Sequence, residues 1–395
     1  MVAVRIWVRG GARVERLPGQ ALVAGRALAE GTARRGWRQI AEEAEARGMA
    51  LGSFGSFEIH GVGVDALAAD WELAVDWAAE LILEASFPED RCRWIARQAA
   101  AELESLTDQP EVETALAFLD QLYAPHPRSR PLHGSAASLG ELTSGKCAGF
   151  HRRALAGGVI ATLAGTVDED VAARRLEDAF SDLRGRAAGA PEPPPIRGRP
   201  EPWRRVETGA RDQAHLYLGK VTVSRLHADH PALELAGVIL GAGAGLAGRI
   251  PQRIREREGL AYAAQAAAAA GAGLDPGRFV AYAGTAPAMV ARAEAAAREE
   301  LARLVADGVT EDELAGARSY LLGQEPFHRE TARQWAEILA EAELYGLPLD
   351  RPEWWPERLL ALDRRQVEEA VRTHLDPQGL RVTVGVPRPR RRARE

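Results

Sequence analysis

The strongest constraint on the fold of this chain is an internal duplication. Leu142 to Val167 (LTSGKCAGFHRRALAGGVIATLAGTV) aligns without gaps on Leu362 to Pro387 (LDRRQVEEAVRTHLDPQGLRVTVGVP). Each copy predicts a short amphipathic helix, a turn that contains glycine and a strand of alternating apolar residues. Thr143 and Asp363 precede the two helices, and both residue types are good N-caps. The chain is therefore expected to contain two copies of one folding unit.

A second pair of segments extends the duplication. Trp77 to Leu103 and Ala296 to Leu322 each predict two consecutive helices, and in the second copy Gly308 ends one helix while Thr310 caps the next. A segment that predicts strands precedes each helix pair, namely Met49 to Val64 and Arg278 to Gly284. The repeated order of strand, helix pair, helix and strand predicts the α+β class, with helices packed on one face of a sheet.

The proline-rich segment Gly189 to Trp203 (GAPEPPPIRGRPEPW) marks the boundary between the copies. Proline lacks a backbone donor and fixes φ, so neither a helix nor a central strand can continue through it. We expect a first domain over residues 1–188, a linker over 189–203, and a second domain over 204–387. The basic residues 388–395 are expected to be a solvated tail.

Composition excludes several classes of protein. Fifty Lys and Arg against fifty-six Asp and Glu give a net charge of −6, so the positive field of a nucleic-acid binder is missing. Two cysteines, Cys92 and Cys147, are too few for a disulfide framework, and they are expected to be buried thiols. No apolar run reaches the roughly 20 residues of a membrane helix. We expect a cytoplasmic protein without a membrane or nucleic-acid partner.

The second half contains the most informative motif. A predicted strand is followed by a helix over Pro231 to Leu240, a glycine loop over Gly241 to Gly248, and a helix from Gly248 to Arg257 that ends before a turn at Gly259. The loop superficially resembles a dinucleotide fingerprint. A dinucleotide loop follows a strand, whereas this loop follows a helix, so a nucleotide cofactor is not expected.

This run, PALELAGVILGAGAGLAGRIPQRIREREGLAYA, resembles the C-terminal half of the insulinase–pitrilysin family of zinc peptidases. FPEDR, YAPHPRSRPLHGSAASLGELT and FHRR in the first half continue the resemblance, as do DGVTEDELAGARSYLLG and ELYGLPLDRPEWWPERLLAL in the second. The family implies two homologous α+β domains, each a mainly antiparallel sheet with helices on one face. It also implies a clam-shell arrangement around a peptide-binding chamber.

The family's catalytic motif is absent. Active members carry HxxEH on a helix near the N-terminus, where two histidines ligate zinc and the glutamate activates the bound water. The matching positions here are Leu22, Gly25 and Arg26, none of which can ligate or activate. The third family ligand is a downstream glutamate that corresponds to Glu102 or Glu104, and the motif leaves open which of the two keeps a role.

No other catalytic or metal centre is predicted. His227 and His230 have a spacing that suits two ligands, with Glu234 four residues further on, but Pro231 places His230 before the helix, so both histidines are expected in an exposed loop. His126 and His133 lie in a proline-rich segment that is expected at the surface, and His151 lies beside two arginines. We expect no metal and no cofactor in this chain.

One functional element of the family persists. Arg255 and Tyr262 match the arginine–tyrosine pair with which the family's C-terminal domains hold the carbonyl groups of a substrate backbone. Both side chains are donors that can stabilise negative charge on a peptide oxygen. Gly259 lets the chain turn between them, so that Tyr262 begins the next strand, although the alanines of Gln265 to Gly273 are poor strand formers. The glycine loop, with Gly241, Gly243 and Gly245, could line the chamber and flex.

The combination resembles the non-catalytic subunit of two-subunit bacterial peptidases in this family. It implies a heterodimer in which an HxxEH-bearing homologue supplies the zinc, while Arg255 and Tyr262 bind an extended peptide opposite the metal. Alone, the chain is not expected to be a peptidase. Two alternatives remain: a catalytically inactive homodimeric scaffold or peptide-binding protein without a proteolytic partner, and a subunit that matures one particular peptide precursor.

Overall fold

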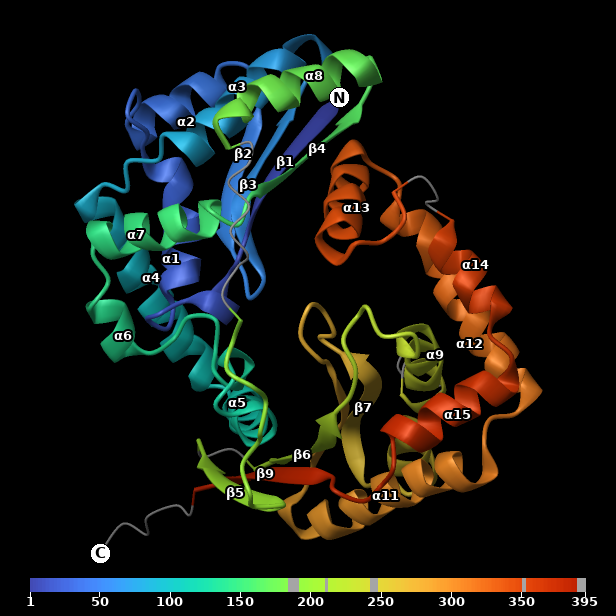
Figure 1. Cartoon of the computed structure of the whole chain (residues 1–395). Coiled ribbons are helices and arrows are strands. Elements are labelled where there is room, and N and C mark those ends of the chain that lie inside the picture. Colours follow the sequence, from blue (N-terminus) through green and yellow to red (C-terminus); the bar gives the residue numbers. More distant parts are fainter. Residues whose placement is uncertain (184–191, 210–211, 242–247, 350–352, 389–395) are drawn as a thin grey trace, which may run out of the picture. The chain divides into compact units, whose positions relative to one another are not determined.

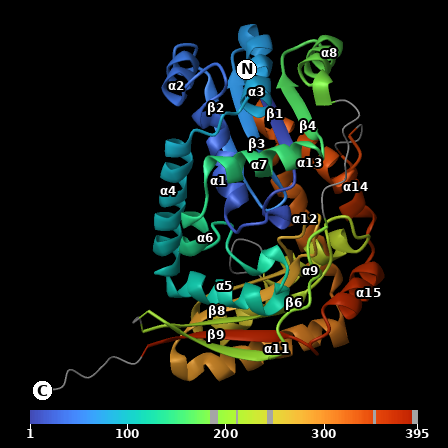
Figure 2. The same ribbon diagram turned by 60° about the vertical axis from the view of Figure 1, so that its left-hand side comes forward.

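The computed structural model describes residues 1–183, 192–209, 212–241, 248–349 and 353–388. They form two compact α+β units (Figures 1 and 2), which confirms the fold class predicted from the duplication. Unit 1 comprises Met1–Glu104, Arg130–Pro194 and Pro326–Leu349. Unit 2 comprises Ser105–Ser129, Pro195–Glu325 and Asp350–Glu395. None of the described helices is both long enough and apolar enough to cross a membrane.

Unit 1 is built on a four-stranded antiparallel sheet. Its strand order is β2 (Ala50–Gly55), β3 (Ile59–Ala66), β1 (Val2–Arg9) and β4 (Val159–Gly165), so β2 lies at an edge. Alternate residues of β1 point to opposite faces, and its valines and Ile6 enter a core shared with helices α1, α3 and α7. The helices formed by the first part of the chain are α1 (Gln20–Ala27), α2 (Trp37–Glu45), α3 (Trp71–Leu83), α4 (Glu89–Thr107), α6 (Ala136–Gly140), α7 (Ser144–Leu155) and α8 (Glu169–Ala179).

Unit 2 is built on a five-stranded sheet. Its order is β5 (Trp203–Thr208), β9 (Arg381–Pro387), β6 (Ala214–Val221), β8 (Arg278–Thr285) and β7 (Ala261–Ala270), with β5 and β9 parallel and the other pairs antiparallel. Its edge strand β7 contacts α9. The helices packed around this sheet include α9 (His230–Leu240), α10 (Arg249–Pro251), a π-helical turn (Gln252–Arg257), α11 (Val290–Asp307), α12 (Glu311–Gln324), α14 (Trp354–Ala361) and α15 (Arg364–His374).

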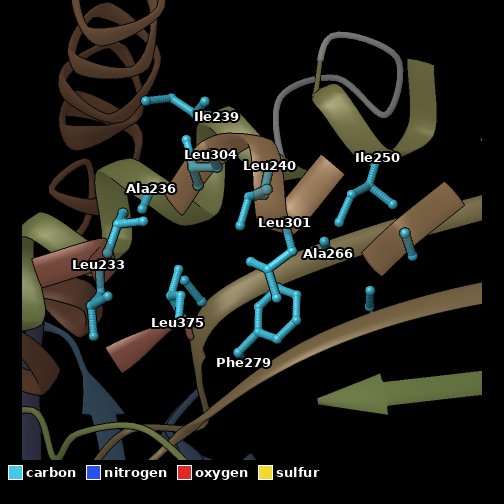
Figure 3. Packing of buried hydrophobic residues seen from close by; sticks show 14 of the residues in the cluster. Leu233, Ala236, Ile239, Leu240, Ile250, Ala266, Phe279, Leu301, Leu304 and Leu375 are labelled. Atoms are coloured by element: carbon cyan, nitrogen blue, oxygen red, sulfur yellow. The ribbon is translucent and has the colours of Figure 1, made fainter. Parts of the chain in front are cut away.

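The core of unit 2 explains why the alanine-rich segment forms β7. Figure 3 shows Leu233, Leu240 and Phe279 packed together between α9 and the sheet. A Cβ placed on Gly241 would lie 2.3 Å from the backbone nitrogen of Ala266, so α9 ends almost in contact with the strand. Side chains larger than alanine on β7 would keep α9 from approaching the strand this closely. Tertiary packing thus overrides the weak strand propensity of alanine.

Each sheet carries one helix on the face opposite its main helical layer, which the sequence did not predict. Helix α13 (Ala332–Tyr345) packs on β1 and β4 of unit 1, where Thr162 Oγ1 donates a hydrogen bond to Ala336 O at 2.8 Å. Helix α5 (Pro110–Tyr123) packs on β9 and β6 of unit 2 (Figure 1), where Thr383 Oγ1 donates to Gln121 Oε1 at 2.7 Å. The two halves of the sequence therefore exchange a helix, whereas the sequence-based division at residues 189–203 assigned each half to one domain.

The repeated helices begin where the sequence indicated. Thr143 caps α7, Asp363 caps α15 and Thr310 caps α12, each by accepting a backbone N–H in the first turn. Gly308 follows the last residue of α11 with φ of 76°. Local capping chemistry is thus visible in the sequence because it involves residues only a few positions apart.

Replacing Thr310 by alanine is expected to lower the free energy of unfolding by about 1 kcal/mol. Thr310 Oγ1 accepts the Glu313 N–H at 3.2 Å, and the Glu313 carboxylate accepts the Thr310 N–H at 2.8 Å. The loss can be measured by urea unfolding. Thr310→Ser keeps the hydroxyl and is the control, so an equal loss in both variants would assign the effect to the methyl group instead.

Candidate functional site

Helix α1 holds Leu22, Gly25 and Arg26, the three positions that the family resemblance aligned with the zinc motif. It begins after Gly19, whose φ is 85°, and it lies against β2 and β3. Leu22 is buried in the core of unit 1, and Gly25 is buried as well. Arg26 is the motif position whose side chain reaches solvent, with 34% of its area exposed.

An ion pair joins α1 to α4 at this position. Arg26 Nη1 donates to both carboxylate oxygens of Glu102 on α4, each at 2.9 Å, and His133 Nε2 lies 3.2 Å from Glu102 Oε2. The structure therefore selects Glu102 over Glu104 as the carboxylate that faces α1. Two residues apart on a helix, these glutamates point in different directions. A guanidinium in this position balances the carboxylate charge that a metal ion would otherwise balance.

The backbone of α1 also leaves no space for the catalytic glutamate. A Cβ on Gly25 would lie 2.3 Å from Phe54 O, and a Cβ on Gly55 would lie 2.1 Å from Ala21 O. Both distances are far inside van der Waals contact, so α1 and β2 approach each other through paired glycines. The residues at this position do not fit a zinc ion, and no catalytic step can be derived through one.

Arg255 and Tyr262 are brought together by the turn between them. Arg255 lies in the π-helical turn that follows α10, Gly259 adopts a φ of 59°, and Tyr262 is the second residue of β7. The Arg255 guanidinium carbon lies 5.7 Å from the centroid of the Tyr262 ring. Tyr262 lies at the start of a strand, as the sequence predicted, and the structure shows that this strand is at an edge of the sheet.

Both side chains are open to solvent. Tyr262 is 81% exposed, and the Arg255 side chain is 41% exposed, with Glu256 as its ion-pair partner at 3.6 Å. Tyr262 is the extra residue of a β-bulge between the Ala261 and Ala263 pairs, and bulges redirect side chains away from the regular alternation. A phenol and a guanidinium presented in this way can donate to carbonyl oxygens of a bound peptide.

An ion-pair network that the sequence did not reveal holds this turn in place. Arg253 binds Glu258, Glu299 at 3.1 Å and Glu300 at 3.5 Å, and the hydrogen bond from Arg253 keeps the pKa of Glu258 below its usual range. Arg249 anchors the start of the same segment through two bonds to Glu313, each at 2.7 Å. The charged side chains of RIPQRIRERE therefore differ in role. Arg249 and Arg253 form ion pairs that hold the turn in place, whereas Arg255 faces outward.

The glycine loop is described only at its ends. Gly241 follows α9, and a Cβ on Gly248 would lie 2.6 Å from the Gly241 Cα, so the two ends of the loop meet. Gly243 and Gly245, which the sequence suggested as part of a chamber wall, lie outside the described residues.

A cavity of about 460 Å³ lies beside β2, an edge strand of the sheet in unit 1. Its lining includes Trp7 and Phe54, whose rings contact edge to face, and the charged side chains of Arg5, Asp65 and Arg333. Arg5 is buried and donates to Asp65 at 2.8 Å, which fixes a paired charge in the floor of the cavity. The cavity borders β2 on the sheet face that also carries α13.

Several expectations for histidines were wrong. His230 is not in an exposed loop: it is the first residue of α9, it is 5% exposed, and burial lowers its pKa to about 4. His126 is also buried, 3.5 Å from Asp275, because its proline-rich segment packs into unit 2. Only His227 of the candidate pair is exposed.

A buried histidine pair lies in unit 1. His60 Nε2 and His151 Nδ1 are 2.9 Å apart, and the outer nitrogens face Gly10 O at 3.2 Å and Ile82 O at 2.7 Å. Burial, together with the neighbouring ring, lowers the pKa of His60 to about 3, and burial lowers the pKa of His151 to about 4. Cys92 and Cys147 are buried in the same core, as expected.

Comparison with known proteins identifies the family. Residues 1–136 match the model described as insulinase (peptidase family M16), and residues 156–321 match the peptidase M16 inactive domain. A protein of Mycobacterium leprae named as an uncharacterized zinc protease is 31% identical over 356 residues, which are 87% of this chain and 78% of that protein. A Streptomyces coelicolor protein of the same description is 27% identical over 327 residues, 80% of this chain and 70% of that protein.

Solved structures agree with this family in fold. The peptidase M16 inactive domain from Pseudomonas fluorescens superposes with a TM-score of 0.87 at 23% identity, covering 98% of this chain and 93% of that one. A protease from Helicobacter pylori gives a TM-score of 0.85 at 16% identity, covering 98% and 94%. The chain belongs to the insulinase (M16) family of peptidases.

Proposed function

We propose that this chain is the non-catalytic, substrate-binding subunit of a heterodimeric zinc peptidase. In this proposal an HxxEH-bearing homologue supplies the zinc. Arg255 and Tyr262 bind the backbone of an extended peptide opposite that metal. The observation that carries the proposal is the exposure of Tyr262, 81%, at a bulge on an edge strand and beside an outward-facing arginine.

This exposure is unusual for a structural role. A tyrosine that serves only to pack would bury most of its ring, because the ring supplies most of its free energy of transfer. The side chain of Tyr262 instead makes no hydrogen bond within the part of the chain that the structure describes, and its ring contacts the guanidinium of Arg255. A phenol without an internal acceptor, held beside a guanidinium whose partner Glu256 lies 3.6 Å away, fits an external acceptor such as a peptide carbonyl.

Both sheets also offer an edge to an extended peptide. Strand β2 of unit 1 and strand β7 of unit 2 are terminal in their sheets. An added strand would gain main-chain hydrogen bonds that do not depend on sequence, and neighbouring pockets would select side chains. The cavity beside β2 has the aromatic and charged lining that such selection needs. These features support peptide binding in a chain whose own zinc position is filled by the Arg26–Glu102 ion pair.

Replacing Tyr262 by phenylalanine, or Arg255 by alanine, is expected to lower kcat/KM of the assembled pair roughly 100-fold, as loss of one oxyanion donor does. Arg257 is exposed on the same turn, so Arg257→Ala is the matched control and should leave activity unchanged. The measurement is cleavage of a fluorogenic peptide by the chain, by its HxxEH-bearing homologue, and by the two mixed.

Three results would contradict the proposal. Peptide cleavage by the chain alone would place a catalytic centre in it. If mixing the chain with its homologue gave no gain in activity, the homologue would not be its catalytic partner. A stable homodimer with no affinity for the homologue would favour the scaffold alternative. Equal losses in Arg257→Ala and Arg255→Ala would show that the turn contributes only its net charge.

A further inference from the structure

Three potential metal ligands converge in unit 2, far along the sequence from the zinc-motif helix. His227 and Asp229 lie just before α9, and His374 is the last residue of α15. One ligand atom of each lies within 4.8 Å of the others. His374 Nε2 is 2.8 Å from Asp229 Oδ2, and His227 Nδ1 is 3.8 Å from the same oxygen.

The sequence motif HADH pointed to a different set. Its spacing suits His227 and His230 with Glu234, a set that the sequence analysis did not favour, and His230 in fact turns into the core against Trp355, with its ring centroid 5.9 Å away. The structure instead joins His227 to His374, whose rings meet edge to face at 5.2 Å. The two residues are 147 positions apart (374 − 227), so no local pattern could have paired them.

The conformation of Asp229 differs from that of an ordinary helix cap. It occupies the N-cap position of α9, where an aspartate normally accepts a backbone N–H of the first turn. Its side chain makes no such bond and points to His374 instead. His227 Nδ1 accepts the Asp229 N–H at 3.1 Å, which makes this nitrogen the unprotonated one, and a metal ion at the cluster would take its lone pair in place of that hydrogen bond. The backbone thus orients two donors on one short loop toward a third from another helix.

We propose that His227, Asp229 and His374 form a binding site for a divalent transition-metal ion, with zinc as the best fit. Two imidazoles and one carboxylate suit zinc, cobalt, nickel or copper, whereas magnesium and calcium prefer a full set of oxygens. Donor atoms bound at about 2.1 Å in a tetrahedron lie roughly 3.4 Å apart. The cluster reaches this spacing by small rotations of His227 and Asp229, whose side chains are 45% and 40% exposed.

Such an ion ties two elements of unit 2 together. It links the loop before α9 to the end of α15, and both helices contribute to the core that supports β7. Three protein ligands leave a fourth position for water or for a ligand from another molecule. The site is a property of this chain alone and does not depend on the proposed peptidase partner.

The test is a zinc titration of the full chain carrying no histidine tag. We expect one zinc per chain by isothermal calorimetry, confirmed by metal analysis after gel filtration, and an absorption spectrum of tetrahedral cobalt when cobalt replaces zinc. His227→Gln and His374→Gln should each weaken zinc binding roughly tenfold or more. His328 is another exposed histidine, and His328→Ala is the matched control that should leave affinity unchanged.

Thermal unfolding separates the metal site from a plain His–Asp ion pair. If zinc binds here, its addition raises Tm of the wild type but not of His227→Gln or His374→Gln, because a ligand stabilises only the state that binds it. If the residues form only an ion pair, each variant lowers Tm equally with and without zinc. That result, or zinc binding that is the same in the wild type and in the His227→Gln/His374→Gln double variant, would overturn the proposal.

Discussion

Replacing Gly25 by alanine is expected to lower the free energy of unfolding by about 3 kcal/mol, although alanine is the better helix former. The new methyl carbon would lie 2.3 Å from Phe54 O and 2.6 Å from Gly55 N, both backbone atoms of β2 that no side-chain rotation can move. Helix α1 must shift from the sheet and open the core around Leu22. Urea unfolding of the two variants Gly25→Ala and Gly316→Ala measures the effect.

Gly316 is the matched control. It lies exposed in α12, and a Cβ there meets nothing within 4 Å, so alanine should stabilise the chain by about 0.5 kcal/mol. A loss at both positions would trace the effect to something other than the contact with β2. An unchanged stability in Gly25→Ala would show that α1 moves freely against β2, and the argument that packing excludes a catalytic glutamate would fail.

The same contact predicts the outcome of rebuilding the motif. The triple variant Leu22→His, Gly25→Glu and Arg26→His is expected to bind no zinc at α1, because a glutamate at position 25 would clash with the backbone of β2 and displace the helix from its present position beside Glu102. Metal analysis of that variant against the wild type provides the measurement. Stoichiometric zinc that is lost again on replacing Glu102 would contradict this expectation.

Acidification from pH 7 to pH 4.5 is expected to lower the free energy of unfolding by about 5 kcal/mol through the buried His60–His151 pair. Burial lowers the pKa values of these rings to about 3 and about 4, whereas an unfolded histidine titrates near 6.5. Between those values the unfolded chain binds more protons than the folded chain. The stability is therefore fully present above pH 6.5 and is lost as the pH falls toward 4.

Urea unfolding at a series of pH values tests this prediction. His151→Gln removes one titrating ring and should reduce the pH dependence by about half, whereas His328→Ala, at an exposed position, should leave it unchanged. The pair makes three contacts but two neutral rings carry only two N–H groups, so one shared extra proton would complete the chain of hydrogen bonds. Full stability retained at pH 4.5 would show that the folded pair holds that proton.

The repeat segments were predictable because their signals are local. Capping residues such as Thr143 and Asp363 act on N–H groups three positions away, and the alternation of β4 and β9 reflects which face each side chain takes. The packing of helices on sheets, in contrast, joins residues that are far apart in the sequence. The exchange of α5 and α13 between the two halves depends on which sheet face each helix buries, and no pattern within either helix specifies this choice.

For the candidate site, too, the sequence predicted the local features but not the contacts between distant residues. The sequence located Arg255 and Tyr262, and it placed a glycine turn between them. It did not show that Arg253 and Arg249 lock that turn through Glu258 and Glu313, since the charges of a polar run look alike until their partners are known.

The sequence by itself determined that this chain has two copies of an α+β unit, and that it contains no HxxEH motif, because repeats, caps and ligand identities are written in residue types at short spacing. The tertiary structure alone decided what surrounds Gly25 and Arg26: Arg26 meets Glu102 across 76 residues (102 − 26), and paired glycines bring α1 onto β2. It alone also placed His374 beside His227 and Asp229. Such contacts arise from the packing of whole elements, so they become visible only when the fold brings distant segments within bonding distance.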